Sequence, residues 1–103
     1  MIKVTVLYPN HSDARFDFDY YLNRHLPDAE RKLGASCRKV EVDQGLAAGA
    51  PGVAAGYVAI THLFFDSIEI FQLAFAPHAA AILADVPNFT NVEPVIQIGQ
   101  VRR

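Results

Sequence analysis

Four stretches of the chain carry the hydrophobic patterns of β-strands. Near the N-terminus, apolar residues at every second position predict a strand over 2–8 that ends at Pro9. Alternation also predicts a second strand over about 36–43 and a fourth over about 92–101. The stretch 57–65 is apolar at odd and even positions alike, which indicates a third strand buried on both faces.

Two longer stretches have the three-to-four-residue spacing of amphipathic helices, and each follows a Phe-Asp pair whose Asp is a favourable N-cap. The first helix is predicted over about 17–33, with a kink or a fresh start at His25-Leu26-Pro27. The second is predicted over about 66–84 and is bent or weakened at Pro77. The stretch 45–56 is rich in Gly and Ala without periodicity, which predicts a mobile connection between strands.

The order βαββαβ favours one α+β domain over residues 1–103, a ferredoxin-like sandwich with both helices on one sheet face. Hydrophobic residues make up 51% of the chain, a high share for so small a protein. Because the helices cover one face only, the apolar outer side of 57–65 needs another cover. The pattern therefore predicts a two-fold homodimer through the open sheet face.

Charge and composition exclude several classes of partner. Nine basic and eleven acidic residues are scattered and give a net charge of −2, so we expect no nucleic-acid partner. We expect no membrane partner either, because no window resembles a signal peptide or about 18 apolar residues in a row. The single cysteine, Cys37, excludes an internal disulfide and fits the cytoplasm.

Motifs for cofactors are missing from the sequence. The chain has no Gly-x-Gly-x-x-Gly segment and no phosphate-binding loop, so we expect no nucleotide cofactor. The four histidines, His11, His25, His62 and His78, have none of the spacings typical of zinc ligands. We therefore expect neither a cofactor nor a metal ion.

One histidine lies on the inward stripe of the first predicted helix. At 100° per residue, His25 falls among Phe18, Leu22, Ala29 and Leu33. An imidazole in a core is unusual, because burial penalises its charged form and its neutral form still needs partners. It is either a core histidine satisfied by a carbonyl or water, or a titratable group lining a cavity. Tyr21, four residues earlier, is its neighbour on the same surface.

The second predicted helix shows the same feature. His78 falls among the apolar residues Phe71, Ala74, Phe75 and Ile82. If the helices run antiparallel on one sheet face, both histidines could share one cavity. The alternative is a satisfied or surface histidine that the preceding proline turns away from the core.

Three segments, occurring in order along the chain, resemble a known family. They are Tyr8-Pro9-Asn10, the run from Phe16 to Pro27, and Val86-Pro87-Asn88-Phe89-Thr90. Together they are similar to the EthD family, which is named for ethyl tert-butyl ether degradation and belongs to the dimeric α+β barrels. The resemblance implies a ferredoxin-like fold, a dimer whose sheets form a barrel, and a pocket at His25 and Tyr20–Tyr21. Related barrels catalyse diverse reactions or none, so the resemblance leaves the reaction open.

The leading hypothesis is cofactor-independent acid–base chemistry, of an isomerase, cyclase or lyase type, on a small apolar carbonyl or phenolic compound. His25 would be the general base, since histidine has an unperturbed pKa of about 6.5, and Tyr21 or Tyr8 would donate to an oxyanion. The expected substrate-binding residues are Tyr8, Phe18, Tyr20, Phe71, Phe75, His78 and Ile82.

Two alternatives from other classes remain open. The same pocket could hold a hydrophobic metabolite without turning it over, or the protein could be an accessory or structural dimer with a filled core. A cavity of about 300 Å³ or more beside His25 would favour ligand binding, and a packed interior would favour a structural role.

Overall fold

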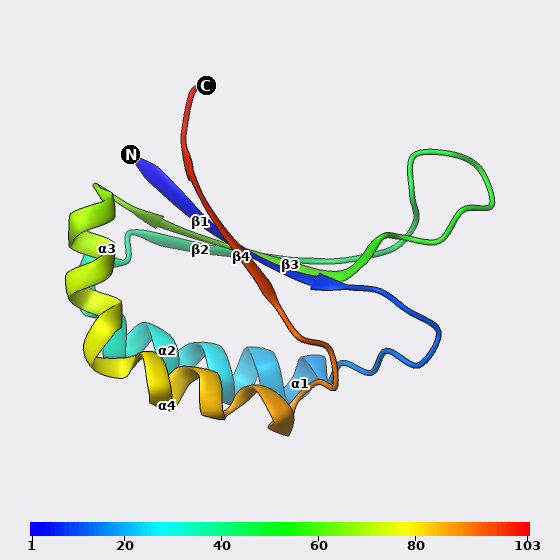
Figure 1. Ribbon diagram of the computed structural model, residues 1–103, viewed down its shortest axis with the longest axis horizontal. Coiled ribbons are helices and arrows are strands. Elements are labelled where there is room, and N and C mark those ends of the chain that lie inside the picture. Colours follow the sequence, from blue (N-terminus) through cyan, green and yellow to red (C-terminus); the bar gives the residue numbers. More distant parts are fainter.

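A computed structural model describes all residues from 1 to 103. Four strands form one antiparallel sheet in the order β2-β3-β1-β4: β1 (Ile2–Pro9), β2 (Lys39–Gln44), β3 (Tyr57–Phe65) and β4 (Val95–Gln100). The helices are α1 (Phe18–Tyr20), α2 (Leu26–Leu33), α3 (Ile68–Phe75) and α4 (Ala79–Ala84). All of them lie on one side of the sheet (Figure 1). This is the α+β, ferredoxin-like sandwich that the sequence predicts.

The strands pair in register about β1, which lies between β3 and β4. Val4 is opposite Leu63 on one side and Ile98 on the other. Along β3, alternate residues from Ala59 to Phe65 are buried beneath the helices. The core is therefore a single layer between the sheet and the helices.

The outer face of the sheet has no covering element (Figure 1). Val58, Ile60 and Phe64 of β3 lie there half-buried, as the apolar pattern of both sides of this strand predicts. The neighbouring strand β2 adds the exposed side chains of Lys39, Glu41 and Asp43 on the same face. The apolar patch is thus narrower than the sequence indicates, because β2 makes one edge of this face polar.

The first helical segment runs without a break from Phe18 to Leu33, but its middle is a π-helical turn over Tyr21–His25. The N–H of Leu26 donates to the carbonyl of Tyr21, five residues earlier, instead of four. Pro27 has no N–H and its ring would crowd the carbonyl of the residue four before it, which the wider turn relieves. The predicted kink is therefore a π-turn, a feature that is frequent at functional sites.

The π-turn shifts the helical register before it. Leu22, which the α-helical wheel places on the inward stripe, is 47% exposed, whereas Tyr21 and His25 are buried. The prediction for Leu22 is wrong because residues in a π-turn advance by less than 100° each.

The second helical segment begins one residue later than the sequence indicates. Ser67 is the N-cap, and its hydroxyl accepts a hydrogen bond from the N–H of Ile70 at 3.1 Å. Asp66 instead pairs with Arg38 at 2.9 Å. The weakening predicted at Pro77 is confirmed, because a 3-10 turn over Ala76–His78 separates α3 from α4.

The stretch Ile68–Asn88 is 21 residues long and contains an 18-residue window with a mean hydropathy of 1.3, so it could cross a membrane by length and composition alone. The expectation that no window is so apolar is therefore wrong for this stretch. Its inward side chains, Phe71 and Phe75 among them, pack against the sheet through Phe65 and its neighbours. In this fold the stretch is the second helical segment of the one helical layer (Figure 1).

The connection between β2 and β3 projects beyond the sheet and has internal order (Figure 1). The N–H of Val53 donates to Ala50 at 3.2 Å, and Gly52 has φ of 76°, which together describe a type II turn after Pro51. At the base, the amide of Asn10 donates to the carbonyl of Ala55 at 3.0 Å. The connection therefore has a hydrogen-bonded turn at its tip and no strand of its own, and its mobility stays a prediction.

Candidate functional site

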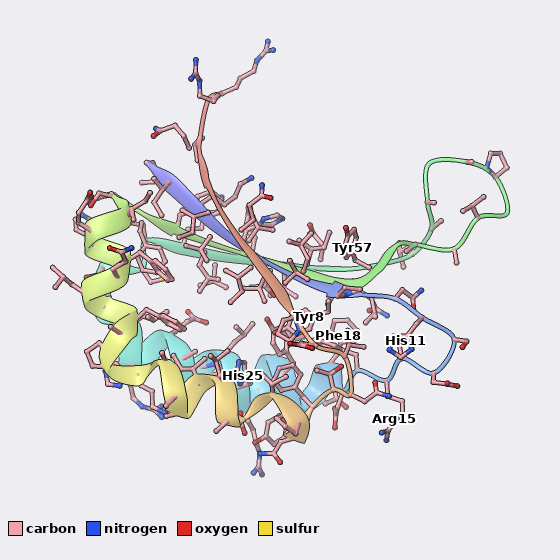
Figure 2. The ribbon with its side chains drawn as sticks, in the orientation of Figure 1. Tyr8, His11, Arg15, Phe18, His25 and Tyr57 are labelled. Atoms are coloured by element: carbon pink, nitrogen blue, oxygen red, sulfur yellow. The ribbon has the colours of Figure 1, made fainter.

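His25 ends the π-turn and is only 7% exposed. Figure 2 shows it in the helical layer beneath the sheet. Its Nδ1 lies 2.9 Å from Oδ2 of Asp85, the residue that follows α4. Its Nε2 has no hydrogen-bond partner in the protein, and no buried side-chain nitrogen or oxygen is left fully enclosed without one. The ring is therefore held at one nitrogen and free at the other.

Asp85 is the centre of a small hydrogen-bond network. Its Oδ1 accepts from the hydroxyl of Tyr20 and from the side-chain amide of Asn88, both at 2.7 Å. Burial acts to raise the pKa of this carboxyl, but the hydrogen bonds from its three partners outweigh it and lower the pKa below its ordinary value. An ionised carboxylate only accepts, so Nδ1 of His25 carries a proton, and the neutral form of the ring presents its lone pair at Nε2.

Tyr21 lies in the same π-turn and is almost fully buried. Its ring stacks on His25 with centroids 5.4 Å apart and 15° between the planes. Its hydroxyl is 2.5 Å from the hydroxyl of Thr61, on the inner face of β3. Burial raises the pKa of Tyr21, and the contacts with Thr61 and Tyr8 lower it by less, so the phenol stays protonated at neutral pH.

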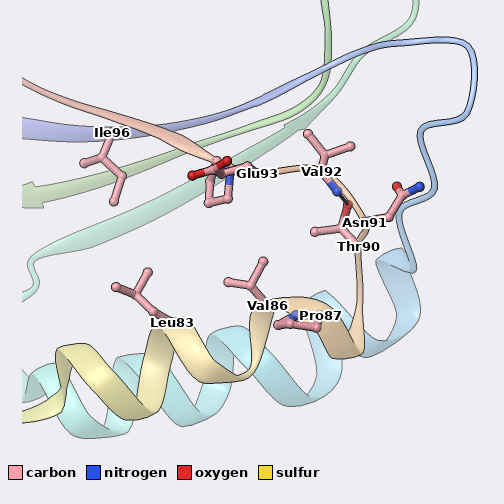
Figure 3. A pocket seen from close by; sticks show the side chains of 9 residues that line it. Leu83, Val86, Pro87, Thr90, Asn91, Val92, Glu93 and Ile96 are labelled. Atoms are coloured by element: carbon pink, nitrogen blue, oxygen red, sulfur yellow. Dashed lines mark hydrogen bonds between the residues drawn. The ribbon is translucent and has the colours of Figure 1, made fainter.

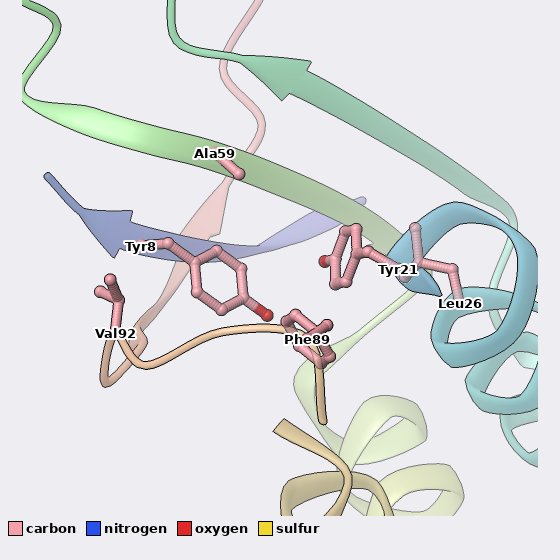
Figure 4. Packing of buried hydrophobic residues seen from close by; sticks show 6 residues of the cluster. All are labelled: Tyr8, Tyr21, Leu26, Ala59, Phe89 and Val92. Atoms are coloured by element: carbon pink, nitrogen blue, oxygen red, sulfur yellow. The ribbon is translucent and has the colours of Figure 1, made fainter. Parts of the chain in front are cut away.

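Aromatic rings surround this pair on the side away from α3. Phe89 lies 4.6 Å from the His25 ring, and Tyr8 lies 5.8 Å from the Tyr21 ring. Figure 4 shows Tyr8, Tyr21 and Phe89 converging in one buried cluster. Burial raises the pKa of Tyr8, and the nearby Tyr21 hydroxyl raises it further by a smaller amount. Tyr8 is therefore a neutral, packed side chain of the core.

A small cavity of about 70 Å³ lies beside His25, between the helices and the sheet. Five of the residues predicted for the site line it: Tyr21, His25, Phe71, Phe75 and Ile82. The other lining residues are Val4, Leu26, Ala29, Leu33, Thr61, Leu63 and Ile96. The cavity is thus apolar apart from the imidazole and two hydroxyls.

The remaining predicted site residues lie elsewhere. Phe18 packs on Phe16 with ring centroids 4.5 Å apart, and Tyr20 reaches the site only through Asp85. His78 is half-buried in the 3-10 turn between α3 and α4 and does not line the cavity. The structure does not bring the two histidines into one cavity: His25 lines it, and His78 lies in the turn at Pro77 outside it.

Two polar residues of the site have no counterpart in the sequence predictions. Asp85 appears in the sequence only as the end of a helix, and Thr61 only as a position in an apolar strand. The signal for Thr61 is a polar side chain on the inward parity of a buried strand, which requires a partner. Asp85 has a weaker signal, an acidic residue directly before the Val86-Pro87-Asn88 segment. Nowhere in the structure do three or more His, Cys, Asp or Glu side chains converge as metal ligands would.

A larger groove opens beside the edge strand β4 (Figure 3). Its volume is about 610 Å³. The residues that line it come from α4, the turn after it and the approach to β4: Leu83, Val86, Pro87, Thr90, Asn91, Val92, Glu93, Pro94 and Ile96. A smaller hollow of about 480 Å³ lies nearby, between Arg15–Asp17 and Pro87–Asn91. Neither was predicted from sequence. The groove forms where the stretch 83–96 folds back on itself, and the second hollow forms where 15–17 meets 87–91.

Known structures similar to this chain share nearly its full length. An EthD-like protein from Ralstonia eutropha JMP134 is 42% identical, with a TM-score of 0.92 over 99% of this chain and 94% of that one. An EthD family protein from Bacillus halodurans C-125 is 24% identical, with a TM-score of 0.73 over 99% of both chains. A dimeric protein of unknown function and ferredoxin-like fold from Bacteroides fragilis is 17% identical, with a TM-score of 0.57 over 97% and 95%. The last two likenesses show the fold alone.

A family model described as the EthD domain matches residues 9–93. Among curated proteins, no match to the chain was found. The match covers the second and third sequence segments that resemble this family and all of the first except Tyr8. It confirms the resemblance, so the chain belongs to the EthD domain family.

Proposed function

We propose that this protein binds a small, mostly apolar carbonyl or phenolic compound and transfers a proton with His25 as general base, without a cofactor. The single observation that supports this most is the buried imidazole whose Nδ1 is fixed by Asp85 at 2.9 Å while Nε2 stays free. A base held in one tautomer beside an apolar cavity is poised to accept a proton at Nε2.

The proposed reaction follows from the partners of the ring. Nε2 takes a proton from a carbon next to a carbonyl, or from a phenol, and the imidazolium that forms is stabilised by the Asp85 carboxylate. The Tyr21 hydroxyl donates to the developing oxyanion while Thr61 donates to the Tyr21 oxygen. Return of the proton from Nε2 to another atom of the substrate completes an isomerisation, a cyclisation or a bond cleavage.

The cavity volume favours a second candidate function. At about 70 Å³ it is well below the 300 Å³ or so of a typical small-molecule site, so the interior beside His25 is nearly filled. In that case His25 and Asp85 form a buried structural pair, and the protein acts as an accessory or structural dimer without catalysis.

A homodimer through the open sheet face is part of the proposal. Only 15 of the 103 residues are buried within one chain, so much apolar surface remains to be covered. Phe64→Glu, on that face, is expected to give monomers by analytical ultracentrifugation, and Leu73→Glu, on the exposed side of α3, is expected to leave dimers. A wild-type protein that sediments as a monomer, or an unchanged Phe64→Glu dimer, would contradict this interface.

A cytoplasmic location is proposed on the basis of the single free thiol of Cys37.

Deuterium incorporation tests the catalytic proposal without knowledge of the natural substrate. A panel of apolar ketones and phenols is incubated with the protein in D2O, and exchange of the hydrogens activated by the carbonyl or hydroxyl group is followed by NMR. The wild type should accelerate exchange for some members, and His25→Ala should lower that rate by about 10² to 10⁴. His11→Ala, in an exposed loop, is the matched control and should keep the full rate.

Three results are distinguishable. Equal exchange by wild type and His25→Ala would refute the role of His25 as base. Binding of panel members without exchange would favour the metabolite-holding function. Neither binding nor exchange would favour the structural dimer.

A further inference from the structure

We infer, on the basis of the proposed function, that the groove beside β4 is the mouth of the His25 cavity and that Ile96 controls passage between them. The groove would hold the apolar body of a neutral ligand while its reacting end enters the cavity. Nothing in the family match or the neighbours assigns a role to this groove.

The two hollows meet at one side chain. Ile96 lines both the groove of about 610 Å³ and the cavity of about 70 Å³. On α4, Ile82 lines the cavity and the next residue, Leu83, lines the groove. Figure 3 shows Leu83 and Val86 pointing towards β4 and Ile96 pointing back at them. The groove and the cavity are therefore adjacent, with Ile96 between them.

The position of Ile96 allows it to move. It pairs with Val6 of β1, but β4 is an edge strand with no neighbour beyond it, and Ile96 is 45% exposed. A rotamer change of one half-exposed side chain occurs in picoseconds to nanoseconds. A gate of this kind opens without any rearrangement of the backbone.

The two volumes fit such a connection. The cavity has room for about two water molecules at roughly 30 Å³ each, so a ligand that reaches Nε2 of His25 must keep most of its atoms outside it. The groove volume lies inside the range of small-molecule sites, about 300 to 1,000 Å³. The groove and the cavity together form a site that neither makes alone.

The polar groups of the groove define the ligand. The hydroxyl of Thr90 donates to Arg15 and accepts from the N–H of Val92, and the amide of Asn91 is bonded to the backbone of Arg15 and Asp13. Both side chains are already satisfied, so the groove offers contacts to apolar groups. The exposed carboxylate of Glu93 at the rim repels anions. The ligand class is a neutral, elongated, mostly apolar molecule with one polar reacting end.

Chemical modification of His25 tests the gate independently of turnover. Diethyl pyrocarbonate acylates an accessible unprotonated imidazole, and peptide mass spectrometry gives the rate at His25 relative to exposed His11 in the same sample. Ile96→Ala should raise this relative rate several-fold and Ile96→Phe should lower it several-fold. Leu73→Phe, an exposed position on α3 outside the groove, is the matched control and should leave it unchanged. Equal relative rates in wild type and both Ile96 variants, with unchanged thermal unfolding, would overturn the inference.

A pair of probes tests the ligand class. 2-Naphthol is neutral and 2-naphthoate is anionic, with the same apolar rings. The wild type should bind 2-naphthol several-fold more tightly, and Glu93→Gln should narrow that difference. Preference for 2-naphthoate would overturn the assigned ligand class. The two proposals can fail separately. If the modification rate of His25 changes in the Ile96 variants but His25→Ala keeps full deuterium exchange, the groove is still the mouth of the cavity and the catalytic proposal is refuted.

Discussion

Replacing Asp85 with Asn removes the carboxylate that His25 contacts and puts an amide of almost the same shape in its place. The carboxylate accepts three hydrogen bonds, from Tyr20, Asn88 and His25, at 2.7, 2.7 and 2.9 Å. In Asp85→Asn the amide oxygen can still accept the first two, but the amide nitrogen now faces Nδ1 and can only donate. The imidazole must then carry its proton on Nε2, so the lone pair no longer faces the cavity.

The expected loss of stability follows from one charged hydrogen bond. Such a bond contributes about 1.5–3 kcal/mol when fully buried, and the Asp85 side chain is 28% exposed. We therefore expect Asp85→Asn to lower the free energy of unfolding by about 1–2 kcal/mol, measured by urea denaturation. Long-range ¹H–¹⁵N NMR of the ring should show the proton on Nδ1 in the wild type and on Nε2 in the variant. Deuterium exchange of any turned-over compound should fall by about 10² or more.

A second Asp–His pair in the same chain provides the control. On the outer face of the sheet, Asp43 lies 3.6 Å from Nε2 of His62 and its side chain is 70% exposed. Exposed pairs of this kind contribute little, so Asp43→Asn should change stability by less than about 0.5 kcal/mol. If Asp85→Asn were equally harmless, or kept the proton on Nδ1 of His25, the account of the site would be refuted.

Three further changes test the fold and the site. Gly45→Ala places a Cβ 2.0 Å from the Tyr57 carbonyl oxygen and should lower the free energy of unfolding by about 1–3 kcal/mol. Gly49→Ala, whose Cβ has no atom within 4 Å, is the control and should change that free energy by less than about 0.5 kcal/mol. Equal effects of the two substitutions would contradict the close approach at Gly45. Because the pKa of Asp85 is lowered in the folded protein, its stabilisation is present above the ordinary Asp range near pH 4 and is lost as pH falls through the lowered value. Acid titrations of stability should therefore be flatter for Asp85→Asn, and parallel curves would count against the network. Tyr21→Phe leaves the buried Thr61 hydroxyl unpaired and should destabilise by about 1–3 kcal/mol in thermal or urea unfolding, while no change would show that the bond is not formed.

The local pattern of hydrophobic and polar residues was enough to predict the strands and helices of this fold. The strand Tyr57–Phe65 has the bounds that its continuous apolar run predicts, because flanking polar and glycine residues end the run clearly. The second and fourth strands are shorter than predicted, since a 3-10 turn occupies Gly34–Ser36 and Pro94 cannot donate to a strand pair. The order of elements then fixed the sandwich, because few topologies accommodate βαββαβ.

The site was only partly predictable, for identifiable reasons. His25 and Tyr21 are buried neighbours as the helical spacing indicates, but a π-turn rather than an α-turn places them, which is why Leu22 was misplaced. Asp85 lies 60 residues from His25 in the sequence and reaches it only because α4 ends where it does. Thr61 depends on strand register in the same way. Contacts between distant segments carry no periodic signal in a single sequence.

The groove illustrates the same limit. The sequence pattern identifies Ile96 only as one residue of a predicted strand. Its position between the groove and the cavity depends on how α4 packs relative to β4. Edge strands need no unusual residues to line a groove. Only the packing of layers reveals that the cavity beside His25 has a wider neighbour.

The most direct test of the central claim is NMR of the protein labelled with ¹⁵N-histidine and titrated with 2-naphthol at neutral pH. The account predicts that Nδ1 of His25 carries the proton throughout, because Asp85 accepts from it, and that binding shifts the Nε2 resonance of this ring. An Nε2 signal that does not move at saturation, or a free protein with its proton on Nε2, would contradict it.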